Sequence, residues 1–213
     1  MAKHYVELVE HYEACLAEYG DSHRGVDWPN AADAAKRYRV MLDVVRPTRS
    51  PVTLLDVGCG AGHLLEHMRE QNIAGVDYLG LDLSPKFVKL CREKFPETRF
   101  YCVDLLQPSD GDVALPEVDY VVMNGVFTEK RSLSYNEMWQ FFTSLVERAF
   151  TRARVGVAFN VMSKHVDWER PDLFHVPFDD MAKFVRQQLS RHYCFRADYG
   201  LYEYTTYVYR RES

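Results

Sequence analysis

The first part of the chain shows hydrophobic positions at helical spacing. Between residues 2 and 19 apolar side chains recur at intervals of three and four, which predicts an amphipathic helix. Glycine and polar residues over 20–25 interrupt this pattern, and a second helix is expected from Ala31 to Val45, before Pro47. The pattern therefore predicts a helical prefix over residues 1–46.

The periodicity changes after Pro51. Short apolar runs at 52–57, 78–83, 99–104, 118–124 and 154–161 are typical of buried strands, and helices are expected between them at 62–71, 85–95 and 135–150, with another at 178–189. The segments 193–199 and 204–210 alternate aromatic and polar residues across a turn at Gly200, which predicts an antiparallel hairpin. Repeated alternation of strands and helices predicts an α/β fold with a mostly parallel sheet covered on both faces.

Length and composition narrow the class of protein. A chain of 213 residues with 47% hydrophobic and 27% charged residues is typical of one globular domain, here expected over 1–213 with the core at 51–213. The apolar runs are too short to cross a membrane, and the polar start does not resemble a signal peptide. A net charge of -5 makes a nucleic-acid partner less favoured. Oligomeric state is left open.

Five cysteines are scattered along the sequence without a C-x-x-C pair. Such usage is typical of reduced thiols in a cytoplasmic protein and points away from a disulfide framework. It also points away from a zinc site, so we predict no metal.

The strongest motif is D-V-G-C-G-A-G at residues 56–62, between a predicted buried strand and a helix. Glycines let the backbone turn sharply and approach a ligand closely, and the first turn of the helix offers free N–H groups. Twenty positions after Gly62, Asp82 ends the next strand, where a carboxylate can accept hydrogen bonds from two ribose hydroxyls. Strand, glycines, helix and acid in this order predict a nucleoside-binding site.

A dinucleotide fingerprint would need a third glycine at position 63, which is His63. The motif instead resembles motif I of the class I S-adenosylmethionine-dependent methyltransferases, and the order of elements is similar from about Val52 to the C-terminus. The resemblance implies a doubly wound seven-stranded sheet with strand order 3-2-1-4-5-7-6 and strand 7 antiparallel.

The resemblance also implies roles for particular residues. Asp82 would hold the ribose, Asp104 would accept a hydrogen bond from the adenine amino group, and Asn124 would face the transferred methyl group. Arg37 in the prefix is a candidate for the methionine carboxylate or, equally, a residue of a solvated helix face. The expected S-adenosylmethionine site comprises Asp56, Gly58, Cys59, Gly60, Asp82, Leu83, Asp104, Leu105, Asn124 and Arg37.

Three segments are candidates for a substrate site, because ligands of doubly wound sheets lie beyond the carboxyl ends of the strands. They are the prefix, the stretch after the fourth strand, and the long titratable and aromatic stretch 160–175. The candidate substrate residues are Tyr19, Trp28, Phe127, Trp168, Arg170 and Tyr202.

A general base is required only when the acceptor must lose a proton. We take His165 or His175 as the candidate base, against the alternative that each is simply a hydrogen-bonded polar residue. We therefore predict transfer of a methyl group from S-adenosylmethionine to an O or N atom of a small molecule. The alternatives are an RNA or protein methyltransferase, although an N-P-P-Y-like motif is absent after the fourth strand, and a binding protein without catalysis.

Overall fold

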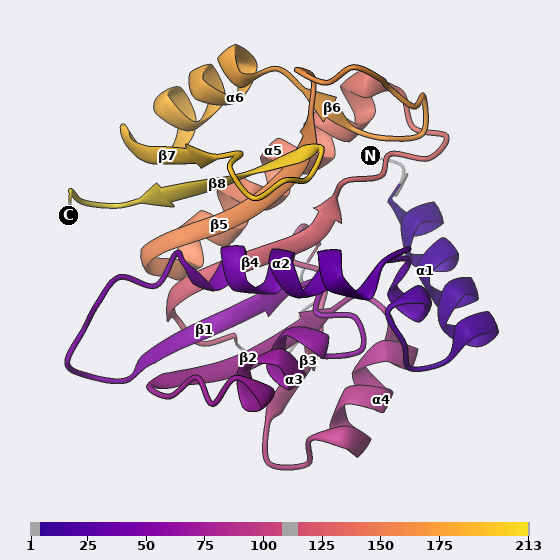
Figure 1. Cartoon of the computed structure of the whole chain (residues 1–213). Helices are drawn as coiled ribbons and strands as arrows, with labels where there is room; N and C mark the ends of the chain where they lie inside the picture. The colour runs from indigo at the N-terminus through magenta and orange to yellow at the C-terminus, as the bar shows by residue number, and fades with distance from the viewer. Residues whose placement is uncertain (1–4, 108–114, 213) are drawn as a thin grey trace.

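The computed structural model describes residues 5–107 and 115–212, and its centre is a sheet whose strands alternate with helices along the chain (Figure 1). The strands are β1 (Val52–Val57), β2 (Val76–Asp82), β3 (Arg99–Cys102), β4 (Val118–Phe127), β5 (Ala153–Ser163), β6 (His175–Val176), β7 (His192–Arg196) and β8 (Glu203–Tyr209). The helices are α1 (Val6–Tyr19), α2 (Ala31–Leu42), α3 (His63–Glu70), α4 (Pro85–Lys94), α5 (Tyr135–Arg152) and α6 (Phe178–Phe184).

The sheet order is β3-β2-β1-β4-β5-β8-β7, and the short strand β6 also pairs with β5. Strands β1 to β5 are parallel, whereas β8 runs antiparallel to both β5 and β7. The predicted strand order and the antiparallel last strand are therefore confirmed. The one addition is β6, a two-residue strand that the sequence pattern did not predict.

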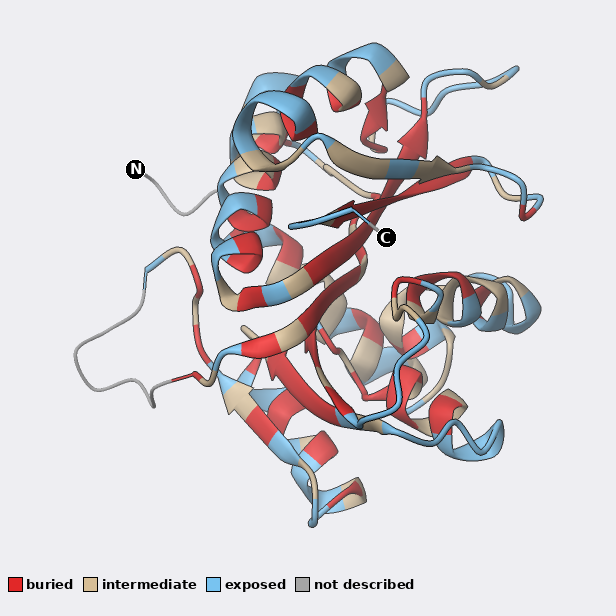
Figure 2. Cartoon of the chain, turned by 90° about the vertical axis from the view of Figure 1, so that its left-hand side faces the viewer, coloured by how far each residue is buried: buried red, intermediate tan, exposed pale blue. Residues whose placement is uncertain are grey.

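Two hydrophobic cores lie on opposite faces of this sheet. One holds the inner sides of α5 and α6, and the other holds those of α2, α3 and α4. Along β1, Leu54 faces the second core and Leu55 the first, as the alternation of a strand requires. Buried residues accordingly follow the strands and the inner sides of the helices (Figure 2). Within the described residues, no helix is long and apolar enough to cross a membrane.

Local signals in the sequence set several helix starts. The Asn30 side chain accepts hydrogen bonds from the backbone of the first turn of α2. Ser84 caps α4, with Pro85 at its first position, and Ser134 and Glu137 form a capping box at α5. The helix predicted over 178–189 is α6 followed by a short π-helical turn at Val185–Leu189.

The structure corrects the expectation that Phe127 belongs to the substrate site. Its ring is fully buried in the core, edge-on to Phe142 with 5.0 Å between ring centroids and edge-on to Phe159 at 6.5 Å. As the last residue of β4 it therefore packs under α5 and does not reach a ligand pocket.

We expect Phe127→Ala to lower the free energy of unfolding by about 3–5 kcal/mol, because it leaves a cavity in a close-packed aromatic cluster. Urea denaturation measures this change. Tyr202→Ala is the control, since that ring is half exposed and its loss should cost below about 1 kcal/mol. Equal effects of the two substitutions would contradict the packing role.

Candidate functional site

A pocket opens at the edge of the sheet where the parallel strands end, and α1 lies against that edge (Figure 1). Its floor is the turn after β1 together with the ends of β2 and β4. Side chains of α1, of the segment before α2 and of α5 complete its walls. Most of its lining is aliphatic or aromatic, and a few polar groups are placed among these side chains.

The turn after β1 carries its glycines in conformations that other residues rarely adopt. Gly58, Gly60 and Gly62 all have positive φ. The Gly60 N–H points at the Asp82 carboxylate and donates to its Oδ2 at 2.9 Å. The Asp82 Oδ1 accepts from the Ser84 N–H at the same distance, so this acid holds the glycine turn against the start of α4. Burial raises the pKa of Asp82 above its usual range.

Two buried oxygen atoms in the pocket accept no hydrogen bond from any described residue: Asp56 Oδ1 and Asn124 Oδ1. The other oxygen of Asp56 accepts from the Tyr78 hydroxyl at 2.7 Å. Burial raises the pKa of Asp56 to about 7, although the Tyr78 bond opposes this shift. Unpaired buried acceptors are costly, so this end of the pocket suits a ligand with N–H or O–H donors.

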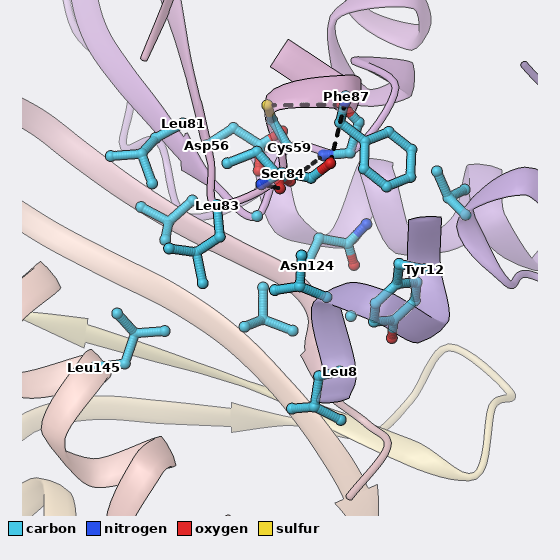
Figure 3. A pocket seen from close by; sticks show the side chains of 18 of the residues that line it. Leu8, Tyr12, Asp56, Cys59, Leu81, Leu83, Ser84, Phe87, Asn124 and Leu145 are labelled. Carbon is cyan, nitrogen blue, oxygen red and sulfur yellow. Dashed lines mark hydrogen bonds between the residues drawn. The ribbon is translucent and has the colours of Figure 1, made fainter. Parts of the chain in front are cut away.

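Figure 3 shows Asn124 between the glycine-turn side of the pocket and the α1 side chains Leu8 and Tyr12. Toward the other end, Tyr5 stacks on Phe141 with 5.1 Å between centroids, and its hydroxyl donates to Asp104 Oδ2 at 2.6 Å. The Asp104 Oδ1 accepts from the Leu106 N–H. Helix α1 thus closes the pocket from Asp104 to Asn124.

A buried polar chain connects the prefix to the end of β4. The Arg37 guanidinium of α2 donates to Glu203 Oε2 at 2.8 Å, and Glu203 Oε1 accepts from the Asn160 amide at 3.0 Å. The Asn160 Oδ1 in turn accepts from the Gly125 N–H at 2.8 Å. Arg37 also lies 4.2 Å above the centre of the Trp28 ring.

Gly125 connects this series of hydrogen bonds to the pocket. It has a φ of 79°, and a Cβ placed on it would lie 2.5 Å from the Trp28 ring. Only glycine fits under this indole, which covers the turn beside Asn124. The hydrogen-bonded series from Arg37 to Gly125 therefore positions both the turn and the Trp28 ring that covers it.

Nine of the ten predicted cofactor residues line this one pocket, as does the predicted substrate residue Trp28. Arg37 does not line the pocket, and its guanidinium forms an ion pair with Glu203. Four of the predicted substrate residues also lie outside the lining of this pocket: Tyr19, Trp168, Arg170 and Tyr202. Tyr19 contacts the Arg24 guanidinium, and Arg170 pairs with Asp172. Trp168 and Tyr202 contact each other.

Neither histidine proposed as a base lines the pocket. The His175 Nδ1 lies 2.7 Å from the Ser163 carbonyl oxygen, and its Nε2 accepts from the Arg170 N–H at 3.4 Å. His165 stacks on Phe178, with 5.0 Å between centroids. Both rings thus have structural partners, and neither is placed to take a proton from an acceptor in this pocket.

Sequence reasoning missed the part of the pocket that α1 and α5 supply. These residues are Leu8, Val9 and Tyr12 from α1, Tyr5 directly before it, and Phe141 and Leu145 from α5. Their helical spacing was visible, but spacing alone does not show whether an apolar face covers a core or a ligand site.

Fold and pocket together define a class of protein: a doubly wound sheet that binds a nucleoside cofactor beyond the ends of its strands. Residues 55–147 match the family model described as a methyltransferase domain. The chain is also 26% identical to "Putative methyltransferase Rv1506c" of Mycobacterium tuberculosis over 163 residues, which cover 74% of this chain and 93% of that protein.

Solved structures agree on the fold. The magnesium protoporphyrin IX methyltransferase of Synechocystis PCC 6803 superposes with a TM-score of 0.65 at 16% identity, covering 97% of this chain and all of that one. The 1,6-didemethyltoxoflavin-N1-methyltransferase of Burkholderia thailandensis gives 0.63 at 15% identity, covering 100% and 92%. The family model, the relative and the shared fold all support the resemblance to class I S-adenosylmethionine-dependent methyltransferases that the motifs indicated.

We expect Arg37→Ala to lower the free energy of unfolding by about 3–5 kcal/mol, because it leaves the buried Glu203 carboxylate without its cationic partner. Urea denaturation measures the loss. Arg39→Ala, on the exposed side of the same helix, is the matched control and should change stability by less than about 0.5 kcal/mol. Unchanged stability with weakened binding of S-adenosylhomocysteine would instead assign Arg37 to the methionine carboxylate.

Proposed function

We propose that this pocket binds S-adenosylmethionine and that the protein transfers its methyl group to an O or N atom of a small molecule. The observation that carries the proposal is the combination, in one pocket, of Asp82 at the end of β2 and two unpaired buried acceptors, Asp56 Oδ1 and Asn124 Oδ1. Both solved structures named above are methyltransferases of small molecules by name, and both were crystallised with S-adenosylhomocysteine.

The residues present fit this cofactor. Asp82 keeps free lone pairs for the ribose hydroxyls, and the unpaired oxygen of Asp56 suits the ammonium group of the methionine part. Leu83, Leu105 and Phe141 offer apolar surface for the adenine ring beside Asp104. When bound, the sulfonium supplies an already activated methyl group, so the protein's own part is to align the acceptor and exclude water.

The acceptor side favours a small, largely apolar molecule. Leu8, Val9 and Tyr12 of α1 face the pocket opposite Asn124, and Trp28 covers the turn beside it. An RNA or protein acceptor would need an open surface, and for RNA a basic one. The chain has a net charge of -5, and the segment after Asn124 lacks a base-stacking motif. A binding protein without turnover is the remaining alternative.

A reducing compartment suits this protein. The cysteines Cys15, Cys59, Cys91, Cys102 and Cys194 form no disulfide among the described residues. Free thiols persist where glutathione and thioredoxin keep them reduced. We propose the cytoplasm on this ground.

Calorimetric titration with S-adenosylhomocysteine tests the cofactor site. We expect Asp82→Ala to weaken binding at least about 10-fold, because charge-assisted hydrogen bonds to the ribose are lost. Asp77→Ala, an exposed acid on the same strand, is the control and should leave affinity unchanged. Folded protein that binds neither the donor nor this product would overturn the proposal. Turnover of labelled methyl donor with small amine and hydroxyl acceptors then separates an enzyme from a binding protein.

The raised pKa of Asp56 predicts that both stability and ligand affinity depend on pH. Its pKa of about 7 in the folded protein lies above the ordinary value of 3.8, so the folded state binds the extra proton between these values. Asp56 therefore lowers stability as pH rises from about 4 to 7. A cationic ammonium favours the ionised carboxylate, so affinity for S-adenosylhomocysteine should rise from pH 6 to 8 with release of a proton. Calorimetry in buffers of different ionisation enthalpy measures this release.

Asp56→Asn is the control for the pH effect, since the amide keeps the shape of the side chain but does not titrate. The variant should bind more weakly, and its affinity should vary less with pH than that of the wild type. An unchanged pH profile in Asp56→Asn would show that another group is responsible.

A further inference from the structure

A second cluster of chemically active side chains lies beside α1, outside the lining of the cofactor pocket. His11 Nε2, Cys15 Sγ and a carboxylate oxygen of Asp27 all lie within 4.8 Å of one another. His11 Nε2 is 2.7 Å from Asp27 Oδ2 and 3.7 Å from Cys15 Sγ. A further carboxylate oxygen, Glu129 Oε2, lies 3.8 Å from the same His11 nitrogen.

Three separate segments build this cluster. His11 and Cys15 are four residues apart, so they share one face of α1. Asp27 follows the 3-10 turn at Arg24–Val26, and Glu129 follows β4, where a bridge to Leu173 fixes its backbone. Only three non-glycine residues in the described parts of the chain have positive φ, and two of them, Asp27 and Arg131, lie here. Strained backbone of this kind is concentrated at functional sites.

The cluster holds more negative than positive charge. Asp27 and Glu129 both approach His11, and the guanidinium of Arg131 lies 3.2 Å from Glu129. Imidazole, thiolate and carboxylate together are ligands that Zn²⁺ prefers, whereas Mg²⁺ and Ca²⁺ prefer oxygen alone. The three ligand atoms lie within 4.8 Å of one another, so modest side-chain adjustments would bring them to the spacing of a tetrahedral ion.

We propose that His11, Cys15 and Asp27 bind a zinc-class divalent ion, with water as the fourth ligand and Glu129 beside the site. Binding would use neutral His11, and Cys15 would release its thiol proton to solvent; no electron is transferred. Asp27 is one-third exposed, which leaves the ion a route of entry.

Such an ion would fasten the wall of the cofactor pocket. Tyr12 neighbours His11 on α1, Val26 and Trp28 flank Asp27, and Val126 precedes Glu129 by three residues; all four line the pocket. Coordination therefore ties α1 to the segment before α2, beside the end of β4. This coupling rests on the proposed function, whereas the ion site itself does not.

Titration of untagged, chelator-treated protein with Co²⁺ tests the site directly. We expect one ion per chain, with visible bands of a tetrahedral site and a thiolate-to-cobalt charge-transfer band that Zn²⁺ abolishes. Cys15→Ser should lose the charge-transfer band, and Cys194→Ser, at an exposed cysteine, should keep it. No bands, or a charge-transfer band that survives Cys15→Ser, would overturn the site.

Asp27→Asn keeps the proposal testable if Cys15→Ser does not fold, because asparagine tolerates the left-handed backbone at this position. It should weaken Co²⁺ binding at least about 10-fold, and unaltered Co²⁺ affinity in this variant would count against the site. Zn²⁺ should raise affinity for S-adenosylhomocysteine about 5-fold or more in the wild type and not in Asp27→Asn. If Co²⁺ binds but Zn²⁺ does not raise the affinity for S-adenosylhomocysteine, the metal site stands and only its coupling to the cofactor pocket is overturned.

Discussion

The Asp82 carboxylate, which accepts hydrogen bonds from the backbone of Gly60 and Ser84, is the interaction on which the site depends. It joins the glycine turn after β1 to the first turn of α4, and both turns lie at the carboxyl edge of the sheet. The register of β1 with β2 brings these groups together, since Val57 pairs with Leu81. An acid that already fixes the floor of the pocket needs little reorganisation to hold a ribose.

The wall of the pocket depends on a different kind of interaction. A parallel sheet buries its strands, so the polar groups Asn160 and Glu203 at the ends of β5 and β8 must pair with one another and with Arg37. This pairing also holds the Gly125 N–H, and with it the turn that Trp28 covers. The antiparallel β8 therefore contributes to the site although none of its residues lines the pocket.

The fold was predictable because each of its signals is local: strand runs, the glycine motif, and caps such as Ser84-Pro85. The acids of the pocket were predictable too, since they end strands whose order the motif implies. The roles of Phe127, Arg37 and His175 were not, because a partner distant in sequence decides each of them: Phe142 and Phe159 for Phe127, Glu203 for Arg37, and the Ser163 carbonyl for His175. The spacing His11-x-x-x-Cys15 carried a signal that the search for C-x-x-C pairs did not detect.

Helix α1 is the element through which these features combine. Only Leu8 and Cys15 of its residues are buried, so it contributes little apolar burial and should open at a lower free energy than the helices of the two cores. A ligand enclosed between α1 and the sheet requires such an opening. Polar contacts between α1 and the segments beside it can stabilise the closed pocket and still allow the helix to open. The contacts of His11 with Asp27 and Glu129 are of this kind.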